Sequence, residues 1–208
     1  EKEITAIKDP VLNSIMQLYS LRNYSIYYLN NSWNLPDLST NESNKPINLL
    51  TKKELLTVIN NKAKAIVQSS QILWNTSDEN FYSIIIFGKE KKLRNTLYEL
   101  LAYEIIEQLQ QVNNSYGDNI EELNNNNLLF ETLPNFIKKN IETTNSNNTV
   151  LWLLQSMLIQ HAKSNNIIKL IDADLYRLTF TSNYNTKYSQ VQIQALNYLK
   201  IGRASCRE

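Results

Sequence analysis

The sequence predicts a mainly α-helical protein, either an irregular helical bundle or a fragment of an α-solenoid, with at most one short pair of strands. Three observations support this fold class. Apolar residues recur at intervals of three and four along most of the chain. Gly88 and Gly117 are the only glycines before residue 200, and 30 asparagines cluster between the periodic segments. Because asparagine disfavours helix interiors and favours caps and turns, these clusters should separate the helices.

Composition sets the broad class of the protein. The chain has 208 residues, of which 42% are hydrophobic and 20% are charged, so it can bury a substantial core. Its formal charge of +1, from 21 basic and 20 acidic residues, argues against a protein built mainly to bind nucleic acid. No apolar run approaches the roughly 18 residues of a membrane-spanning helix. We therefore expect a cytoplasmic or nuclear protein without a membrane span.

The last eight residues, 201–208, differ from everything before them. This segment, IGRASCRE, supplies the only cysteine and one of the three glycines, and it lacks asparagine. It resembles the translation of a short-read sequencing adapter, so we expect a non-native tail and a gene that continues beyond it. Residues 1–200 are then a single helical domain or solenoid segment without cysteine, which excludes disulfides and thiolate metal sites within them.

The first expected helix has a clear start. Asp9 is suited to cap free backbone amides and Pro10 suits the first helical position, so we expect a helix from there to about Leu29. The stretch 30–48 is polar and contains two prolines, and we expect it to be a loop.

A second helix start follows this loop. Thr51 and Glu54 have the spacing of a capping box, in which each side chain accepts a hydrogen bond from the other residue's backbone amide. Apolar residues then recur from Leu55 to Trp74, which predicts one long amphipathic helix. The run 81–87, FYSIIIF, is the best candidate for a strand, although its apolar pattern fits a buried helix equally.

The middle of the chain is predicted to be helical in two segments. Between residues 89 and 112, leucine, isoleucine and valine share one face of a helix. A less regular helix or pair of turns covers 120–141, where the asparagine run 124–127 and Pro134 interrupt the pattern.

The C-terminal third contains the most apolar segment. Residues 150–162 are expected to form a helix at the centre of the core, and helical spacing resumes at 167–178. After a polar loop at 181–187, residues 189–199 (SQVQIQALNYL) are expected to form a further helix. This succession of apolar helix, short break and helix resembles the HEAT or armadillo type of repeat over about a quarter of the chain. The resemblance implies an α-solenoid and names no individual family.

Two candidate sites are weak on chemical grounds. His161 is the only histidine and follows a strongly apolar helical face, so we interpret it as a buried or boundary residue. The pair Gly88-Lys89 follows the possible strand, as in a phosphate-binding loop. Such a loop needs several small residues, however, and Glu90 would repel the phosphate.

The Asp172/Asp174 pair is the sharper candidate. A strand over IIKLI that ended in Asp-x-Asp would place two carboxylates on a divalent metal, as in many transferases. The flanking apolar residues fit a continuous helix better, and in a helix the two carboxylates would point about 200° apart.

Two hypotheses for function follow. The favoured one is a non-enzymatic protein-interaction or scaffold segment of a larger helical protein, with a protein partner and no cofactor. The alternative is a fragment of a metal-dependent transferase-type enzyme, in which FYSIIIF and IIKLI are strands and Asp172 and Asp174 hold the metal. We assign no catalytic, cofactor-binding or metal-binding residue from the sequence, which specifies neither the partner nor the oligomeric state.

Overall fold

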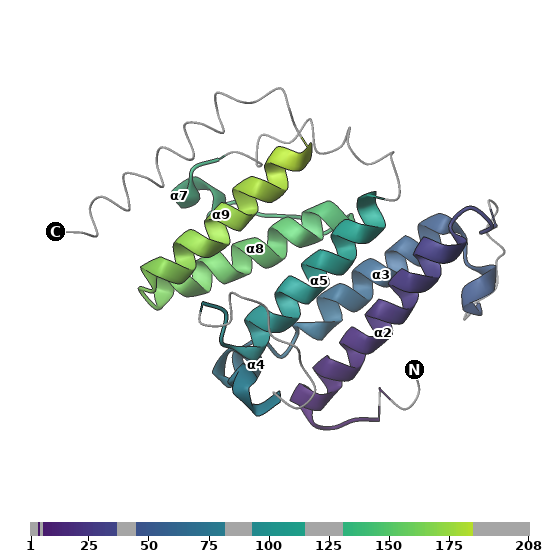
Figure 1. Cartoon of the computed structure of the whole chain (residues 1–208), viewed down its shortest axis with the longest axis horizontal. Coiled ribbons are helices and arrows are strands. Elements are labelled where there is room, and N and C mark those ends of the chain that lie inside the picture. Colours follow the sequence, from purple (N-terminus) through teal and green to yellow (C-terminus); the bar gives the residue numbers. More distant parts are fainter. Residues whose placement is uncertain (1–3, 5, 37–44, 82–92, 115–130, 185–208) are drawn as a thin grey trace. The chain divides into compact units, whose positions relative to one another are not determined.

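The computed structural model describes residue 4 and residues 6–36, 45–81, 93–114 and 131–184. Over these residues the secondary structure consists of α-helices and two short 3-10 helices, and the only β-type pairing is an isolated antiparallel bridge between Ser77 and Thr96 (Figure 1). The prediction of a mainly α-helical fold with at most one short strand pair is therefore confirmed. The candidate strand FYSIIIF, apart from Phe81, the helix at 189–199 and the tail 201–208 lie outside the described residues.

The chain forms two compact units. The first comprises residues 1–116 with 143–150, and the second comprises residues 117–142 with 151–208. Helix α8 (Ser146–Lys163) starts in the first unit and continues in the second. No helix in the described segments is both long and apolar enough to cross a membrane. The expectation of one domain over residues 1–200 stays a prediction.

Helix α2 (Pro10–Asn31) begins as the sequence predicts. The Oδ1 atom of Asp9 accepts hydrogen bonds from the backbone amides of Val11 at 2.8 Å and Leu12 at 2.9 Å, and Pro10 occupies the first turn. The helix runs two residues past the expected end at Leu29. In the described part of the expected loop 30–48, a 3-10 helix, η1 (Ile47–Leu49), begins before the loop was expected to end.

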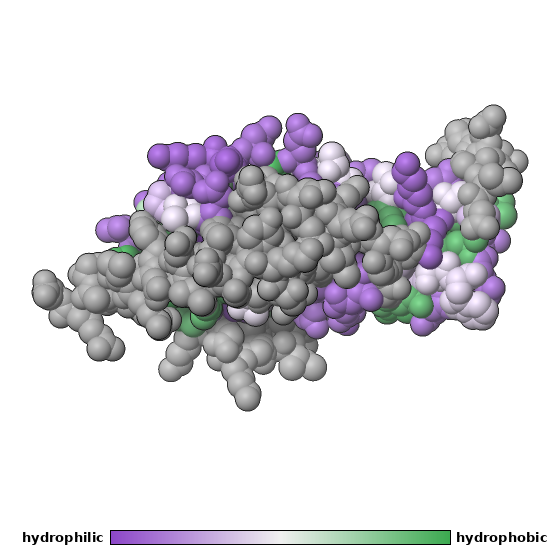
Figure 2. Space-filling view, turned by 90° about the horizontal axis from the view of Figure 1, so that it is seen from above, coloured by the Kyte–Doolittle hydropathy of each residue, from purple (hydrophilic) through white to green (hydrophobic). Residues whose placement is uncertain are grey.

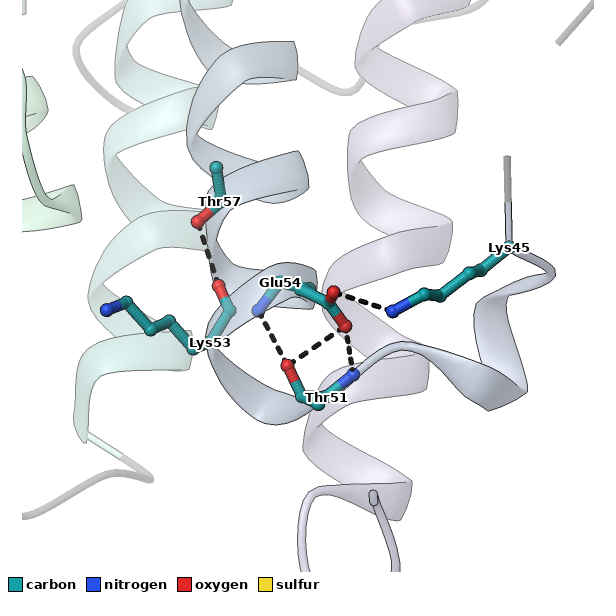
Figure 3. A network of polar contacts seen from close by, with 5 residues as sticks. All are labelled: Lys45, Thr51, Lys53, Glu54 and Thr57. Carbon is teal, nitrogen blue, oxygen red and sulfur yellow. Dashed lines mark hydrogen bonds and ion pairs between the residues drawn. The ribbon is translucent and has the colours of Figure 1, made fainter. Parts of the chain in front are cut away.

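Helix α3 (Lys52–Ile66) starts at the predicted capping box, which Figure 3 shows with its neighbours. Thr51 Oγ1 accepts from the Glu54 amide at 3.2 Å, and Glu54 Oε2 accepts from the Thr51 amide at 2.8 Å. The other Glu54 oxygen, Oε1, lies 2.8 Å from Nζ of Lys45, whose side chain is buried. One carboxylate thus closes the helix N-terminus and anchors the segment that precedes η1.

The predicted helix from Leu55 to Trp74 is wrong as a single element. Helix α3 ends at Ile66, and a separate short helix, α4, covers Ser70–Asn75. The break falls at residues 67–69 and includes Ser69, a residue type that disfavours helix interiors. The Ser69 carbonyl instead accepts from the amides of Ile72 and Leu73, so it starts the new helix.

Helix α5 (Leu97–Asn114) starts later than the predicted position near residue 89, at least within the described residues from 93 onward. Thr96 and Glu99 form a second reciprocal pair: the Thr96 amide donates to Glu99 Oε2 at 3.0 Å, and the Glu99 amide donates to Thr96 Oγ1 at 3.3 Å. This pair fixes the start of α5 at the local T-x-x-E signal, which the periodicity argument overlooked.

The core of the first unit lies where α2 packs against α3 and α5 and where α4 packs against α5. In Figure 1 the helices α2, α3 and α5 run alongside one another. Helix α5 contributes most to this core, and the rings of Trp74 and Tyr98 stack with their centroids 4.2 Å apart between α4 and α5. The fully or almost fully buried residues of α5 include Leu97, Leu101, Ala102, Ile105, Ile106, Leu109 and Val112.

The second unit contains α7 (Leu133–Phe136), most of α8 and α9 (Ile167–Tyr184). A helix or pair of turns was expected over 120–141. Within the described part of that range, residues 131–141, α7 is the only helix. Helix α8 begins four residues before the predicted 150, because Asn145 Oδ1 caps the Asn148 amide at 2.8 Å. Helix α9 extends to Tyr184, into the expected loop 181–187.

A tight turn joins α8 and α9. Asn165 adopts a left-handed conformation with φ of 55°, which asparagine tolerates better than most residues. The Asn166 amide then donates to the His161 carbonyl at 3.0 Å, and Asn166 Oδ1 accepts from the Lys169 amide at 3.2 Å. Asparagine therefore ends one helix and starts the next, as its clustering predicted.

Candidate functional site: the outer face of α2

The candidate pair Asp172/Asp174 does not form a metal site. The segment IIKLI is the first part of helix α9, so its interpretation as a strand is wrong. Asp174 is only 2% exposed, and its Oδ1 accepts a hydrogen bond from Arg177 Nε at 2.7 Å. Because Asp172 lies two helical positions away, about 200° around the axis, the two carboxylates cannot share an ion. Nowhere in the described segments do three or more His, Cys, Asp or Glu side chains gather as a metal site would require.

Arg177 instead organises the interior of the second unit. It is fully buried, donates from Nη2 to the Glu131 carbonyl at 3.1 Å, and places its guanidinium 4.5 Å from the centroid of the Phe136 ring. Gln155 of α8 donates to the carbonyls of Phe136 and Lys139 at 2.7 and 2.8 Å. Side chains of α8 and α9 thus hold the same segment, 131–139. We interpret this cluster as a structural clamp.

Of the remaining sequence candidates, only His161 lies in the described residues. His161 is buried at the end of α8, which confirms its interpretation as a buried or boundary residue. The pair Gly88-Lys89 lies outside the described residues.

An exposed row of large apolar side chains follows helix α2 and its C-terminal turn. Leu12, Tyr19, Ile26 and Trp33 are spaced by seven residues and are 49%, 47%, 50% and 79% exposed. Seven residues turn a helix through almost two full turns, so the four side chains lie in one row with a drift of about 20° per step. We call these four residues the α2 stripe. It extends about 32 Å along the helix, at 1.5 Å per residue.

The opposite side of α2 accounts for the packing of the first unit. Leu21, Ser25 and Tyr28 are buried there, where α2 meets α3 and α5, whereas the buried Ile15 lies at the edge of the row itself. A helix with one buried face normally carries charged residues on the other. In α2 the only charged residue is Arg22. The helix therefore has apolar residues on both faces and lacks the charged exterior of an ordinary surface helix.

Two local interactions define the surroundings of the stripe. The indole Nε1–H of Trp33 donates to the Asn30 carbonyl at 3.1 Å, which anchors the most exposed ring of the stripe against the end of α2. Burial raises the pKa of Glu104 on α5, the charge of Glu107 raises it further, and the charge of Arg22 lowers it. Arg22 thus lies within electrostatic reach of an acidic side chain of the same unit.

Four of the nine large apolar side chains that are exposed in the described residues form the α2 stripe. On the face in Figure 2, the coloured residues form a mosaic of hydrophilic areas with small, separate hydrophobic patches. A shorter row of the same spacing occurs on α9, where Ile168 and Leu175 are 67% and 43% exposed. Of the described surface features, the α2 stripe is the strongest candidate for a docking surface, because it aligns four large apolar side chains on an almost uncharged helix.

Sequence analysis missed this surface, although its signal was present. Tyr28 of the same helix is buried, whereas Tyr19 is half-exposed. The signal was the seven-residue interval between successive large apolar residues from Leu12 to Trp33, together with the single charged residue, Arg22, in α2.

Comparison with known proteins does not identify a function for this surface. No family model, no curated protein and no solved structure matches the chain. The expected resemblance to HEAT and armadillo repeats is therefore supported only in its fold class, a bundle of helices.

Proposed function

We propose that this chain is a non-enzymatic interaction module that docks onto another protein through the α2 stripe. The observation that carries the proposal is the row Leu12, Tyr19, Ile26 and Trp33, exposed at seven-residue intervals on a helix with one charged residue. Such spacing fits a partner helix, because a helix laid along α2 meets one large side chain in every second turn.

The stripe offers a useful binding free energy. Full burial of a large apolar side chain contributes about 1.5–3 kcal/mol, so covering the exposed half of each residue contributes roughly 1 kcal/mol. The four residues together supply roughly 4–5 kcal/mol from this side, before the entropic cost of association. The partner's apolar residues would contribute a similar amount.

The helical hairpins fit a scaffold of the HEAT or armadillo type, which is the finer architecture we propose. Helices α8 and α9 are joined by the short turn Ser164–Asn166, as in the paired helices of such repeats. The proposal of a metal site at Asp172/Asp174 in the enzyme alternative loses its support, since IIKLI is helical and Asp174 is paired with Arg177.

Site-specific photo-crosslinking tests the docking proposal. A benzophenone amino acid is placed at Tyr19 or Ile26 in the full chain, in cells that carry the native gene. As a control, the same probe is placed at Asn61, an exposed position of α3. We expect a discrete crosslinked protein at both stripe positions and at least a several-fold weaker product at Asn61. Equal or absent crosslinking at all three positions would show that the stripe is not a docking surface.

A further inference from the structure

Six Asn-x-Ser/Thr triplets in the sequence match the acceptor motif for N-linked glycans, which are bulky and belong on a protein surface. The acceptor residues of these triplets are Asn23, Asn30, Asn41, Asn75, Asn113 and Asn147. Asn41 lies outside the described residues, and three of the others are exposed. Asn113 and Asn147, in contrast, are only 5% and 3% exposed. The fold therefore buries two acceptors of a surface modification.

The two buried acceptors are bonded to each other inside the first unit. Asn113, near the end of α5, donates from Nδ2 to Oδ1 of Asn147 in the first turn of α8 at 2.7 Å. Thr149, the third residue of the Asn147 triplet, is fully buried, and its hydroxyl donates to Oδ1 of Asn60 on α3. Asn60 Nδ2 in turn donates to the Thr143 carbonyl at 3.2 Å. These bonds join the start of α8 to α3 and α5.

A glycan on either acceptor is incompatible with this packing. Transfer joins the amide nitrogen Nδ2 to the anomeric carbon of the sugar, breaks the bond from that carbon to a lipid diphosphate carrier, and releases one amide proton. The first sugar alone is larger than any amino-acid side chain, whereas protein interiors contain few voids larger than a water molecule. Beside the buried Asn147 the sugar has no space unless α8 separates from α5.

Burial in the folded state does not prevent the modification. Transfer acts on an extended chain and requires the hydroxyl of the third residue, so it precedes folding. In the folded chain the triplet 147–149 lies in the first turn of α8, and the Thr149 hydroxyl is already bonded. A chain that meets the transferase during synthesis is therefore modified first and cannot then close the junction of α3, α5 and α8.

We propose that the first unit folds only when Asn113 and Asn147 carry no glycan, and that this chain is therefore made in a compartment without N-glycosylation, such as the cytoplasm. The inference does not depend on the α2 stripe. It rests on the burial of the two acceptors and on the hydrogen bonds that Asn147 and Thr149 make to other helices.

Glycan mapping in a foreign compartment tests the proposal. The full chain, with an added secretion signal, is expressed in cells that N-glycosylate proteins, and limited proteolysis divides the product into resistant and sensitive pools. Glycopeptide mass spectrometry then gives the occupancy of each acceptor. At Asn113 and Asn147 the occupancy should be lower in the resistant pool, by on the order of ten-fold or more. The exposed acceptors Asn23 and Asn75 are internal controls, and their occupancy should be the same in both pools.

An inhibitor of lipid-linked sugar synthesis, added to the same cells, separates the effect of the glycan from that of the compartment. The resistant pool should then grow several-fold. An unchanged resistant pool, or equal occupancy of Asn147 in the two pools, would overturn the incompatibility of glycan and fold. If most of the chain becomes resistant without the inhibitor while Asn147 stays unoccupied, folding precedes transfer and the restriction to one kind of compartment is wrong.

Discussion

Replacement of Arg177 by methionine tests the account of the second unit most severely. The side chain is fully buried, and it holds Asp174 through a 2.7 Å hydrogen bond and the Glu131 carbonyl through a 3.1 Å hydrogen bond. Arg177→Met keeps much of the volume and removes the charge, which leaves Asp174 as a buried carboxylate without its counter-ion. We expect α8 and α9 to lose stability together.

The magnitude follows from the cost of an uncompensated buried charge. Removing one partner of a buried ion pair typically costs about 3–5 kcal/mol. Because a whole domain is stable by only about 5–15 kcal/mol, this loss is large. The double variant Asp174→Leu/Arg177→Met removes both charges and should cost much less than the single one, since apolar replacement of a buried pair is often close to neutral.

Hydrogen–deuterium exchange, read by mass spectrometry, localises the effect. In Arg177→Met, the amides of α9 and of α8 after residue 150 should exchange on the order of a hundred-fold or more faster, as a loss above about 3 kcal/mol requires. The amides of α5 should be unaffected. Lys138→Met, the same change at an exposed position, should stay within about 0.5 kcal/mol of the parent. A loss below about 1 kcal/mol in Arg177→Met, or a double variant as unstable as the single, would refute the buried-pair interpretation.

Three further predictions concern local interactions, and chemical denaturation of the full chain tests each of them. Thr51→Ala should cost about 1 kcal/mol by removing the helix cap. Thr57→Ala, the same change later in α3 (Figure 3), should cost nothing or stabilise slightly because alanine is the better helix former; equal losses in both would contradict the capping assignment. Thr149→Val should cost about 1–3 kcal/mol, because Asn60 Oδ1 loses the hydroxyl that donates to it in a buried site, and an unchanged midpoint would contradict that bond. Because the pKa of Glu104 is raised, the folded state binds its proton more tightly. This residue's contribution to stability is therefore greatest below the ordinary value of 4.5 and is lost as the pH rises through the raised pKa. Glu104→Gln should therefore be more stable than the parent at neutral pH and should flatten that part of the pH profile, whereas a destabilised variant would show that the Arg22 attraction outweighs burial.

The parts of the fold that sequence predicted correctly depend on interactions within about one helical turn. Two helix starts were predictable from Asp9 and from the Thr51/Glu54 pair, because these side chains accept hydrogen bonds from backbone amides only two or three residues away. The start of α5 at Thr96 and Glu99 has the same signal, and an apolar pattern that seemed to begin earlier concealed it. The break after Ile66 shows the limit of periodicity, which gives no warning when serine interrupts an amphipathic pattern.

The site was less accessible to sequence reasoning because burial is a tertiary property. The spacing of Asp174 and Arg177 is visible in the sequence, but the sequence does not show that α9 buries both against the segment 131–139. The apolar pattern of α2 is likewise visible in the sequence. Only the structure shows that Leu21 is buried while Ile26 is exposed, because only one side of α2 meets α3 and α5.

The central claim, that protein covers the α2 stripe in the working state, has a matched internal test. Ile26 on the stripe and Ile72 on α4 are the same residue type and are 50% and 46% exposed. Hydroxyl-radical labelling should therefore modify them at a ratio near one in the purified chain at nanomolar concentration. In extract from cells that carry the native gene, the account predicts that the ratio of Ile26 to Ile72 labelling falls several-fold. An unchanged ratio in the extract would contradict the claim.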